Sequence, residues 1–449
     1  MVERTAATKD VFQGIRPLSV GQFFIIMPPF TFTPRTYLHF DSPVNAEVAQ
    51  RIATDTAAVA RHSFYPFIQY NVVTQKIRKR EGGGVELRPP KVRPIAYAAH
   101  KDSHIFSHYS AILVERYEQE LQARGLHEVV TAFRSLDHRR NIHFANDAFE
   151  FIRGQGECSV LASDISDYFG TIQHERLKAA WCRLMGVPRL PDDHFAVFKA
   201  VTRYATVDRL DLCRMLSLDP ENPREDRRQR FCSAAQFREI VRGNHLCSVN
   251  RRGFGIPQGS PISAILSNLY LLEFDTEMHT MITGHGGFYR RYCDDILFVV
   301  PTPEARGQVL TMMRTMLTEL GLTAHPDKTE VMDFPGRDML LPESRTLNYL
   351  GFTFDGVNKR IRPASIARYY KKMRAGVSRA RAIRYRVNVR ENNRNWRPLR
   401  TRKLFILYSY LGRHNFLSYA FQAAKIMNDD GIKRQVKAHW RRLLGEIED

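Results

Sequence analysis

Residues 288–300 read FYRRYCDDILFVV, two apolar runs that meet at a polar centre, and this stretch decides the fold. The pattern predicts a strand, a tight turn and a second strand, with Asp294 and Asp295 at the turn. A second apolar run, residues 159–163, ends at Asp164 in the same way. Taken alone, either motif is explained as an ordinary solvent-exposed turn, where aspartate is common. Three carboxylates at strand ends together predict a site for a hard divalent cation such as Mg²⁺, which prefers oxygen ligands.

The rest of the chain predicts an α+β fold. Apolar spacing indicates helices at residues 47–61, 101–124 and 139–153, and the loop at 255–261 leads into an apolar helix from 262 to about 274. Strands are expected at 68–80 and 85–95, joined by glycines 82–84 in a hairpin. No internal repeat is present. Residues 189–252 form a mixed-charge elaboration, with a surface loop at 219–223, whose purpose the sequence does not indicate.

The composition is that of a globular, basic protein. The chain has 449 residues, 43% of them hydrophobic, and a formal net charge of +20, which excludes the disordered and low-complexity classes. No apolar run approaches the roughly 18 residues of a membrane-spanning helix. The N-terminus does not have the pattern of a secretory signal, so we expect a cytoplasmic protein without membrane contact. The six cysteines never form a C-x-x-C pair, which argues against a structural zinc site.

Positive charge is concentrated in the last fifth of the chain. Residues 359–449 contain 24 Lys and Arg against 6 Asp and Glu, whereas the preceding 358 residues carry a net charge of only +2. This asymmetry predicts binding to a polyanion, most commonly nucleic acid; a solvated helical surface is the alternative. Helical spacing over 366–377 predicts an amphipathic helix with a basic outer face, residues 404–421 predict a buried partner helix, and 386–402 a connecting loop. The basic face comprises Lys371, Lys372, Arg374, Arg379 and Arg381.

The order of the motifs resembles that of the reverse transcriptases over about residues 65–355. The sequence DISDYF at 164–169 resembles the first catalytic motif, GIPQGSP at 255–261 the nucleotide-contacting motif, and YCDD at 292–295 the Y-x-D-D motif. Residues 321–329 and 348–352 resemble the next two motifs, and KVRPI at 91–95 resembles the fingers strand. Several motifs in family order make this resemblance specific.

The resemblance implies a two-metal nucleotidyl transfer site. Asp164 and Asp294 would be the main ligands of two Mg²⁺ ions, with Mn²⁺ as a substitute, and Asp295 a secondary ligand or electrostatic partner. The backbone carbonyl of Ile165 is a further candidate ligand. Lys328 is the candidate proton donor to the departing pyrophosphate, with a plain surface lysine as the alternative.

The resemblance also implies contacts to nucleotide and primer. Phe169 would exclude a 2′-hydroxyl by its bulk and so favour dNTPs, unless it is an ordinary core residue. Lys91 and Arg93 would neutralise the triphosphate, or form only a solvated basic strand. Gln258 and Gly259 would let the backbone approach the nucleotide, or form only a helix-capping loop. Tyr349, Leu350 and Gly351 would grip the primer, although the apolar pair could equally be core.

The implied architecture is a right hand. We expect an N-terminal extension at residues 1–50, fingers at 51–157, a palm at 158–355 and a basic helical thumb at 356–449 that packs along the template–primer duplex.

The implied activity is RNA-directed DNA synthesis on an RNA template, with one protein bound to one RNA. No pattern for an RNase H, integrase or endonuclease module follows residue 352, and the N-A-x-x-H and V-T-G signatures of retron enzymes are not found. The chain therefore resembles the standalone bacterial reverse transcriptases related to group II intron enzymes. Many of these act in phage defence, some of them, such as the type 2 kind, with a partner non-coding RNA. An RNA-binding structural or splicing-assistance protein, and template-independent DNA synthesis, are the alternatives.

Overall fold

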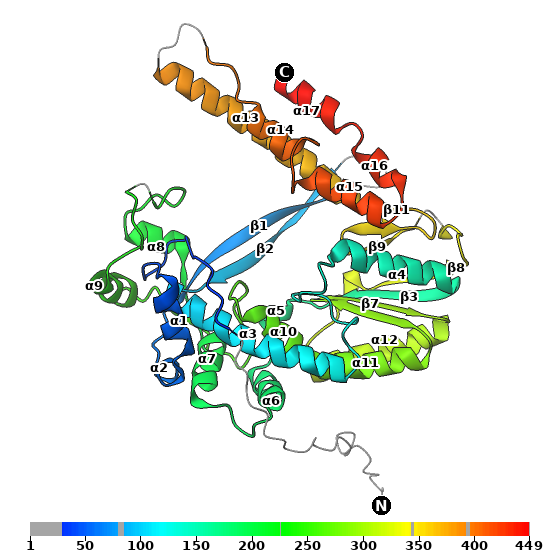
Figure 1. The fold of residues 1–449 in the computed structure, drawn as a ribbon, viewed down its shortest axis with the longest axis horizontal. Coiled ribbons are helices and arrows are strands. Elements are labelled where there is room, and N and C mark those ends of the chain that lie inside the picture. The colour runs from blue at the N-terminus through cyan, green and yellow to red at the C-terminus, as the bar shows by residue number, and fades with distance from the viewer. Residues whose placement is uncertain (1–28, 80–84, 225, 343–344, 392–395, 449) are drawn as a thin grey trace, which may run out of the picture.

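The computed structural model describes residues 29–79, 85–224, 226–342, 345–391 and 396–448 (Figure 1). Most of the expected N-terminal extension, and the glycines of the expected hairpin turn, lie outside these residues. Residues 29–45 contain neither helix nor strand.

A four-stranded antiparallel sheet with the order β6-β7-β3-β8 contains the strands that lead to Asp164 and to the turn at 293–294 (Figure 1). Its strands are β6 (Phe288–Tyr292), β7 (Asp295–Val300), β3 (Glu157–Asp164) and β8 (Glu330–Pro335). The strand–turn–strand prediction for 288–300 and the strand ending at Asp164 are confirmed. The turn itself is formed by Cys293 and Asp294, and Asp295 is already the first residue of β7.

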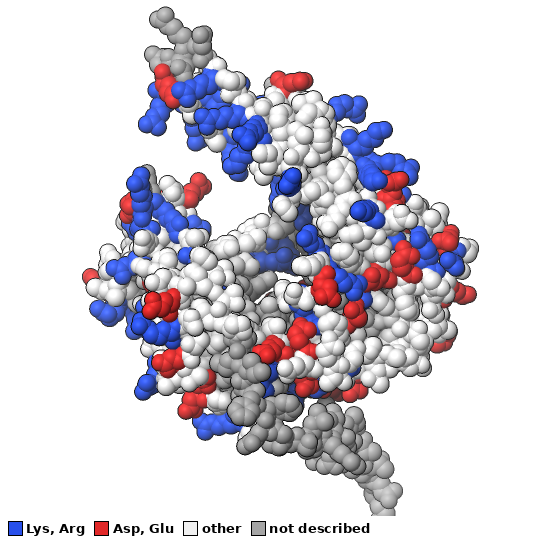
Figure 2. Space-filling view, in the orientation of Figure 1, with Lys and Arg blue, Asp and Glu red and all other residues white. Residues whose placement is uncertain are grey.

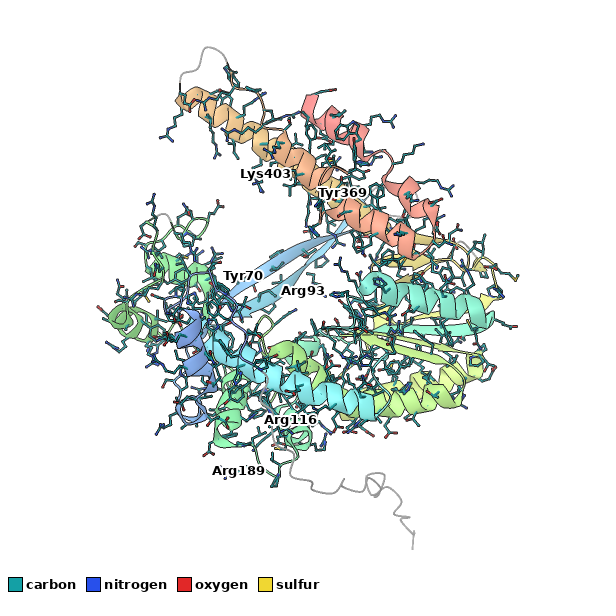
Figure 3. The ribbon with its side chains drawn as sticks, viewed as in Figure 1. Tyr70, Arg93, Arg116, Arg189, Tyr369 and Lys403 are labelled. Carbon is teal, nitrogen blue, oxygen red and sulfur yellow. The ribbon has the colours of Figure 1, made fainter. Side chains whose placement is uncertain are left out.

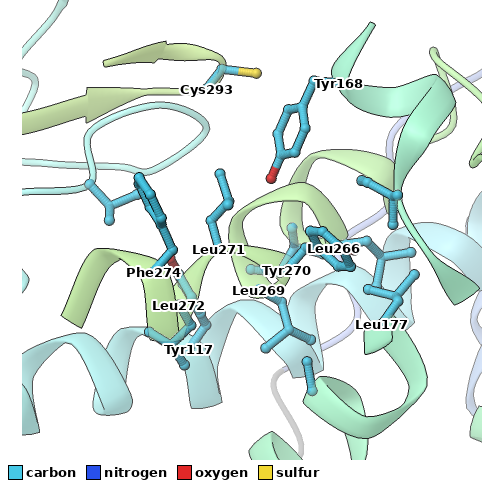
Figure 4. Close-up of a cluster of buried hydrophobic side chains, with 14 of the residues drawn as sticks. Tyr117, Tyr168, Leu177, Leu266, Leu269, Tyr270, Leu271, Leu272, Phe274 and Cys293 are labelled. Carbon is cyan, nitrogen blue, oxygen red and sulfur yellow. The ribbon is translucent and has the colours of Figure 1, made fainter. Parts of the chain in front are cut away.

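The side chains of each strand point alternately to the two faces of the sheet, and each face is covered by a hydrophobic core. In β7, Ile296 and Phe298 point into the core beneath the sheet, whereas Leu297 and Val299 point into a second core on the other side. Helices α11 (Leu272–Gly284) and α12 (Pro303–Glu319) cover the first face and α4 (Asn141–Gln155) the second (Figure 1). Figure 4 shows part of the first core, in which the Tyr168 hydroxyl donates a hydrogen bond to the carbonyl oxygen of Ser267 on α10 (Ser263–Tyr270), and Leu271 lies at the turn between α10 and α11. Full burial of a side chain such as Phe298 contributes roughly 1.5–3 kcal/mol.

The helices of the first 300 residues follow the sequence pattern with two corrections. The single helix expected at 47–61 is two helices, because Asp55 ends the first and caps the second by accepting a hydrogen bond from the Ala58 amide. The helix expected from 262 to 274 likewise breaks at Leu271. The bounds are α1 (Ala46–Thr54), α2 (Thr56–Ala60), α3 (His100–Ala123), α4 (Asn141–Gln155), α5 (Tyr168–Thr171), α6 (His174–Met185), α10 (Ser263–Tyr270) and α11 (Leu272–Gly284).

A long hairpin crosses the middle of the molecule (Figure 1). Its strands, β1 (Phe67–Lys79) and β2 (Val85–Tyr97), confirm the expected pair. The exposed side chains of Val72, Val73 and Val92 show that this stretch of the ribbon has little packed against it.

The elaboration at 189–252 extends the hairpin sheet to the order β2-β1-β4-β5. It has its own small core, in which Phe40 and Ile68 pack with Phe237 and Val241. The loop at 219–223 is largely exposed, as expected. Its elements are α7 (Asp192–Thr202), β4 (Ala205–Asp208), α8 (Arg209–Met215), α9 (Ala234–Gln236), the π-helix η1 (Phe237–Arg242) and β5 (Ser248–Val249).

The C-terminal region is helical, with three corrections. The basic helix α13 continues to Arg390, so the loop expected from 386 begins later. The apolar stretch 404–421 is two helices joined by a turn rather than one. Ile406, Leu407 and Leu411 are 45%, 44% and 56% exposed rather than buried. The remaining elements are α12 (Pro303–Glu319), η2 (Pro326–Lys328), β9 (Leu347–Tyr349), β10 (Phe352–Phe354), β11 (Lys359–Ile361), α13 (Pro363–Arg390), α14 (Arg402–Tyr408), α15 (Phe416–Ile426), α16 (Asp430–Val436) and α17 (His439–Glu448).

Sheets that are antiparallel except for the parallel pairing of β1 with β4, together with segregated helices, confirm the α+β class. Among the described residues, no helix is both long enough and apolar enough to cross a lipid bilayer.

Candidate functional site

Strand register brings the three predicted carboxylates to one end of the central sheet. Asp164 is the register partner of Asp295 across the β3–β7 pair. The amide of Ile165 donates a 3.0 Å hydrogen bond to the carbonyl oxygen of Asp294, which ties the turn to the end of β3. These residues are 130 positions apart in sequence, so only the sheet places them together.

Lys328 lies against this carboxylate group. The amide of His325 donates a 2.7 Å hydrogen bond to the carbonyl oxygen of Asp164, and η2 follows directly. From there the Lys328 ammonium forms an ion pair with the Asp164 carboxylate; their side chains are 35% and 16% exposed. The structure thus brings Lys328 together with Asp164, and its role as a proton donor stays a prediction.

The site carries more negative charge than its own cations balance. Burial, together with the charges of Asp294 and Asp164, raises the pKa of Asp295 to about 6, against the opposing effect of Lys328 and Arg362. A carboxyl that resists ionisation beside two other carboxylates is the electrostatic signature of a site that needs a cation.

The donor set fits a hard divalent metal ion in chemistry. Carboxylate oxygens are what Mg²⁺ prefers. In the described part of the chain, however, no three His, Cys, Asp or Glu side chains converge closely enough to hold an ion as they stand. At Asp164 the ammonium of Lys328 takes the place that a metal cation would need.

The loop at 255–261 packs against Phe169 of α5 and against the end of β2. The amide of Ile256 donates a 2.9 Å hydrogen bond to the carbonyl oxygen of Phe169, whose half-buried ring packs against the core. Gln258 accepts a 2.8 Å hydrogen bond from the Ala96 amide at the end of β2. Gly259 has φ +118°, and a Cβ there would lie 2.8 Å from the Ala96 carbonyl oxygen. Position 259 thus requires glycine because its backbone approaches strand β2 closely.

Lys91 and Arg93 lie on β2, opposite Thr74 and Val72 of β1. Arg93 is exposed and Lys91 half-buried. Figure 3 shows Arg93, with Tyr70 from β1, on the ribbon that crosses the middle of the molecule. The structure therefore places these two candidate triphosphate contacts on the hairpin, away from the sheet that carries the carboxylates.

The residues expected to grip the primer form the turn between β9 and β10. Tyr349 is 4% exposed and its ring lies in the core, as the alternative interpretation held. Leu350 and Gly351 have φ +46° and +91°, so the turn is left-handed. The side-chain amide of Asn141 donates a 3.0 Å hydrogen bond to the Leu350 carbonyl, which anchors the turn to α4.

The basic helix α13 presents its cations as expected. Lys371, Lys372, Arg374 and Arg379 are exposed, whereas Arg381 is half-buried and donates a hydrogen bond to the Glu446 carbonyl on α17. Figure 2 shows Lys and Arg gathered over the C-terminal helices and in the hollow below them. Through its hydrogen bond to the Glu446 carbonyl, Arg381 joins α13 to α17.

Sequence reasoning missed a buried network directly beneath the catalytic turn. The guanidinium of Arg291 forms an ion pair with Asp275 of α11 at 2.5 Å, and both side chains are fully inaccessible to solvent. The Tyr289 hydroxyl donates a 2.6 Å hydrogen bond to the same carboxylate. The signal available in the sequence was a charged residue, Arg291, at a position of β6 where strand alternation directs the side chain into the core.

Residues 214–354, about a third of the chain, match the sequence profile of the family described as "Reverse transcriptase (RNA-dependent DNA polymerase)". The match includes the Y-x-D-D turn, the loop at 255–261 and the turn after β9, but not Asp164. No curated protein matches the chain.

Solved telomerase structures match the chain at low similarity. A telomerase from Candida albicans in complex with a fragment of telomeric RNA gives a TM-score of 0.42 at 9% identity, covering 89% of this chain and 59% of that chain. An apo telomerase from Candida tropicalis, truncated from its C-terminal domain, gives 0.40 at 10% identity, covering 71% and 61%. This chain thus spans about three fifths of the proteins that it matches.

Proposed function

We propose that this chain, which carries a segment of the reverse transcriptase family at residues 214–354, is an RNA-directed DNA polymerase. The observation that carries the proposal is the register of β3 and β7, which joins Asp164 to the Asp294–Asp295 turn. A protein that only bound RNA would gain nothing from three clustered carboxylates, since they repel a polyanion.

Two Mg²⁺ ions, or Mn²⁺ in their place, are the proposed cofactors. Asp164 and Asp294 would hold them, helped by Asp295 and the Ile165 carbonyl. When bound, such ions activate the attacking 3′-oxygen and stabilise the leaving group. Residues of the chain would supply the rest: Lys328 would give a proton to pyrophosphate, and Phe169 would select the sugar of the dNTP.

The proposed path of the nucleic acid follows the positive charge. Fingers at 51–157 and a palm at 158–355 would hold the template and the reacting end, and the C-terminal helices would act as the thumb. Lys371, Lys372, Arg374 and Arg379 would contact phosphates of the RNA–DNA duplex, and the turn at 349–351 the primer. Helices that present cations along their length suit a duplex backbone.

The test is primer extension by the full chain on an RNA template with Mg²⁺ and dNTPs. We expect labelled DNA complementary to the template, and a loss of about a thousandfold or more in the Asp294→Asn variant. Glu304→Gln, an exposed carboxylate beyond the far end of β7, is the matched control and keeps the rate. Template binding, measured by fluorescence anisotropy, should be equal in all three proteins.

The outcomes separate the alternatives. No synthesis by wild type, together with tight RNA binding, would favour a structural or splicing-assistance protein. Product unrelated to the template in sequence would favour template-independent synthesis.

We further propose that the protein is of the standalone bacterial kind, works as one protein on a dedicated non-coding RNA, and serves phage defence. The support is the resemblance of the motif order to that of these enzymes. Sequencing the RNA and DNA that copurify with the chain tests this: one discrete RNA with complementary DNA is expected, and heterogeneous RNA would contradict it.

A further inference from the structure

A cavity of about 340 Å³ opens at the root of the β1–β2 hairpin, within the elaboration whose purpose the sequence does not indicate. Three segments form its walls: residues 64–66 just before β1, residues 203–205 between α7 and β4, and residues 237–247 from η1 to β5. The side chains that matter are those of Phe64, Tyr65, Arg203, Tyr204, Phe237 and Arg242.

The aromatic walls are held by packing. Phe237 is 6% exposed and meets the ring of Tyr65 edge-on at 5.3 Å between centroids. Tyr204, on the opposite segment, meets Phe67 of β1 edge-on at 6.0 Å. Because these rings also pack in the surrounding core, they are fixed in place before any ligand arrives.

The charge of the cavity has one sign. Arg203, Arg242 and His245 line it and are exposed, and none of its lining residues is acidic. Within the described ranges, neither Arg203 nor Arg242 forms an ion pair with a carboxylate. Unpaired arginines beside aromatic rings attract a ligand that combines an anion with a flat ring.

The π-helix η1 places two of the lining side chains, those of Phe237 and Arg242, next to each other. The Gly243 amide donates a 3.1 Å hydrogen bond to the Arg238 carbonyl, five residues earlier. In an α-helix, residues five apart point in different directions. The wider π-turn instead brings the Arg242 guanidinium over the Phe237 ring, at 5.4 Å from its centroid. Such turns often occur at functional sites.

We propose that this cavity binds one unpaired nucleotide of a single-stranded RNA, with the base against the aromatic walls and the phosphate on Arg203 and Arg242. Stacking on fixed rings beside cations is the usual means of holding single-stranded nucleic acid, and the volume suits one nucleotide rather than a duplex. RNA leaving the cavity meets the exposed strand β1, where Tyr70 is 37% exposed. The site extends the proposed function, and its test needs no catalysis.

The experiment uses the full chain and a 4-thiouridine-labelled 15-nucleotide RNA. After irradiation, mass spectrometry maps the cross-linked peptides, and anisotropy gives the affinity. The pocket variant is Arg203→Glu with Arg242→Glu. Its matched control, Arg189→Glu with Arg238→Glu, makes the same change in charge: Arg189 precedes α7, which Arg203 follows, and Arg238 shares η1 with Arg242. Arg189 is 80% exposed and points away from the body (Figure 3).

We expect cross-links within residues 64–67, 203–205 or 237–247, and about tenfold weaker RNA binding in the pocket variant than in the control. Equal weakening in both variants, or cross-links confined to other segments, would overturn the proposal. AMP that binds the wild type but not the pocket variant, without RNA cross-links there, would overturn the RNA assignment in favour of a free nucleotide. Asp294→Asn should cross-link like wild type, so loss of polymerase activity and loss of this site are distinguishable.

Discussion

The guanidinium of Arg291 donates a 3.1 Å hydrogen bond to the carbonyl oxygen of Cys293, the residue that turns the chain into Asp294. Cys293 has φ +59°, a left-handed conformation that costs a non-glycine residue roughly 1–2 kcal/mol. The same guanidinium binds Asp275 through two nitrogens and the Asn268 side-chain oxygen at 3.1 Å. A buried charge network thus holds the turn that carries Asp294, one of the carboxylates of the proposed site.

Arg291→Lys should therefore damage catalysis as well as stability. One ammonium cannot replace the three nitrogens of the planar guanidinium, two of which bind Asp275 while the third binds Asn268 and Cys293. We expect DNA synthesis about a hundredfold slower, since small displacements at a reacting centre cost rate steeply, and a lower melting temperature. Primer extension and thermal unfolding measure the two effects.

Arg290→Lys is the control for this prediction. Arg290 is the neighbour on β6 and is 4% exposed, but it binds Asp147 of α4 at 2.7 Å and does not touch the turn. We expect a similar loss of stability with the rate largely kept. An equal loss of rate in both variants would show that Arg291 supports the fold in general rather than the turn.

Asp295→Asn should stabilise the metal-free protein at neutral pH. The pKa of Asp295 is raised to about 6 in the folded state from about 4 when unfolded. The folded state then binds more protons between pH 4 and 6, so wild-type stability falls as the pH rises through this window. At pH 7.5 the substitution removes the cost of ionising the Asp295 carboxyl in the folded protein, which is at most about 3 kcal/mol of the free energy of unfolding.

Thermal unfolding in EDTA between pH 4 and pH 8 measures this effect. The variant should lack the fall in stability and melt higher than wild type at pH 7.5. Mg²⁺ should raise the melting temperature of wild type more than that of the variant. A variant that melts lower than wild type in EDTA at pH 7.5 would contradict the prediction.

The sequence predicted those parts of the site that depend on local pattern. Alternating apolar residues and turn chemistry were enough for β3, β6 and β7, and for the placing of Asp164 and Asp294 at strand ends. It could not reveal contacts between distant segments. Lys328 pairs with the carboxylate of Asp164, 164 residues away, and position 259 requires glycine because its backbone lies close to Ala96 of β2. In the C-terminal region, apolar content alone predicted burial, yet Leu411 is exposed because the chain turns before α15.

Lys328→Met should tighten metal binding while it slows nucleotide addition. The lysine ammonium neutralises Asp164 in the absence of metal, so a metal ion must displace it. A partly exposed ion pair of this kind is worth roughly 1 kcal/mol, which corresponds to about fivefold tighter binding of Mn²⁺ in the variant. Mn²⁺ titration followed by electron paramagnetic resonance measures the affinity without turnover.

Lys433→Met provides a matched control, since Lys433 pairs with Asp430 at 2.7 Å on the surface of α16. It should leave Mn²⁺ affinity unchanged. Weaker Mn²⁺ binding in Lys328→Met would mean that the lysine helps to assemble the site rather than competing for it.

His39 should make the fold sensitive to acid. The ring is fully buried; its Nδ1 accepts a 2.9 Å hydrogen bond from the Phe40 amide, and its Nε2 lies 3.2 Å from the Tyr97 carbonyl oxygen. Both nitrogens are therefore used by the neutral form, and burial lowers the pKa of His39 to about 3. The unfolded chain binds more protons between pH 3 and 6.5, so stability falls as the pH falls through that range. At pH 5 this loss is about 2 kcal/mol.

His39→Gln replaces the ring with an amide that can accept from Phe40 and donate to Tyr97 without titrating. Urea unfolding at pH 7 and at pH 5 should give a smaller loss for the variant than for wild type, by about 2 kcal/mol. Equal losses would mean that the ring can be protonated in place, which requires the Phe40 amide to find another acceptor. The comparison within each protein removes any constant cost of the substitution, because only the dependence on pH reports the buried histidine.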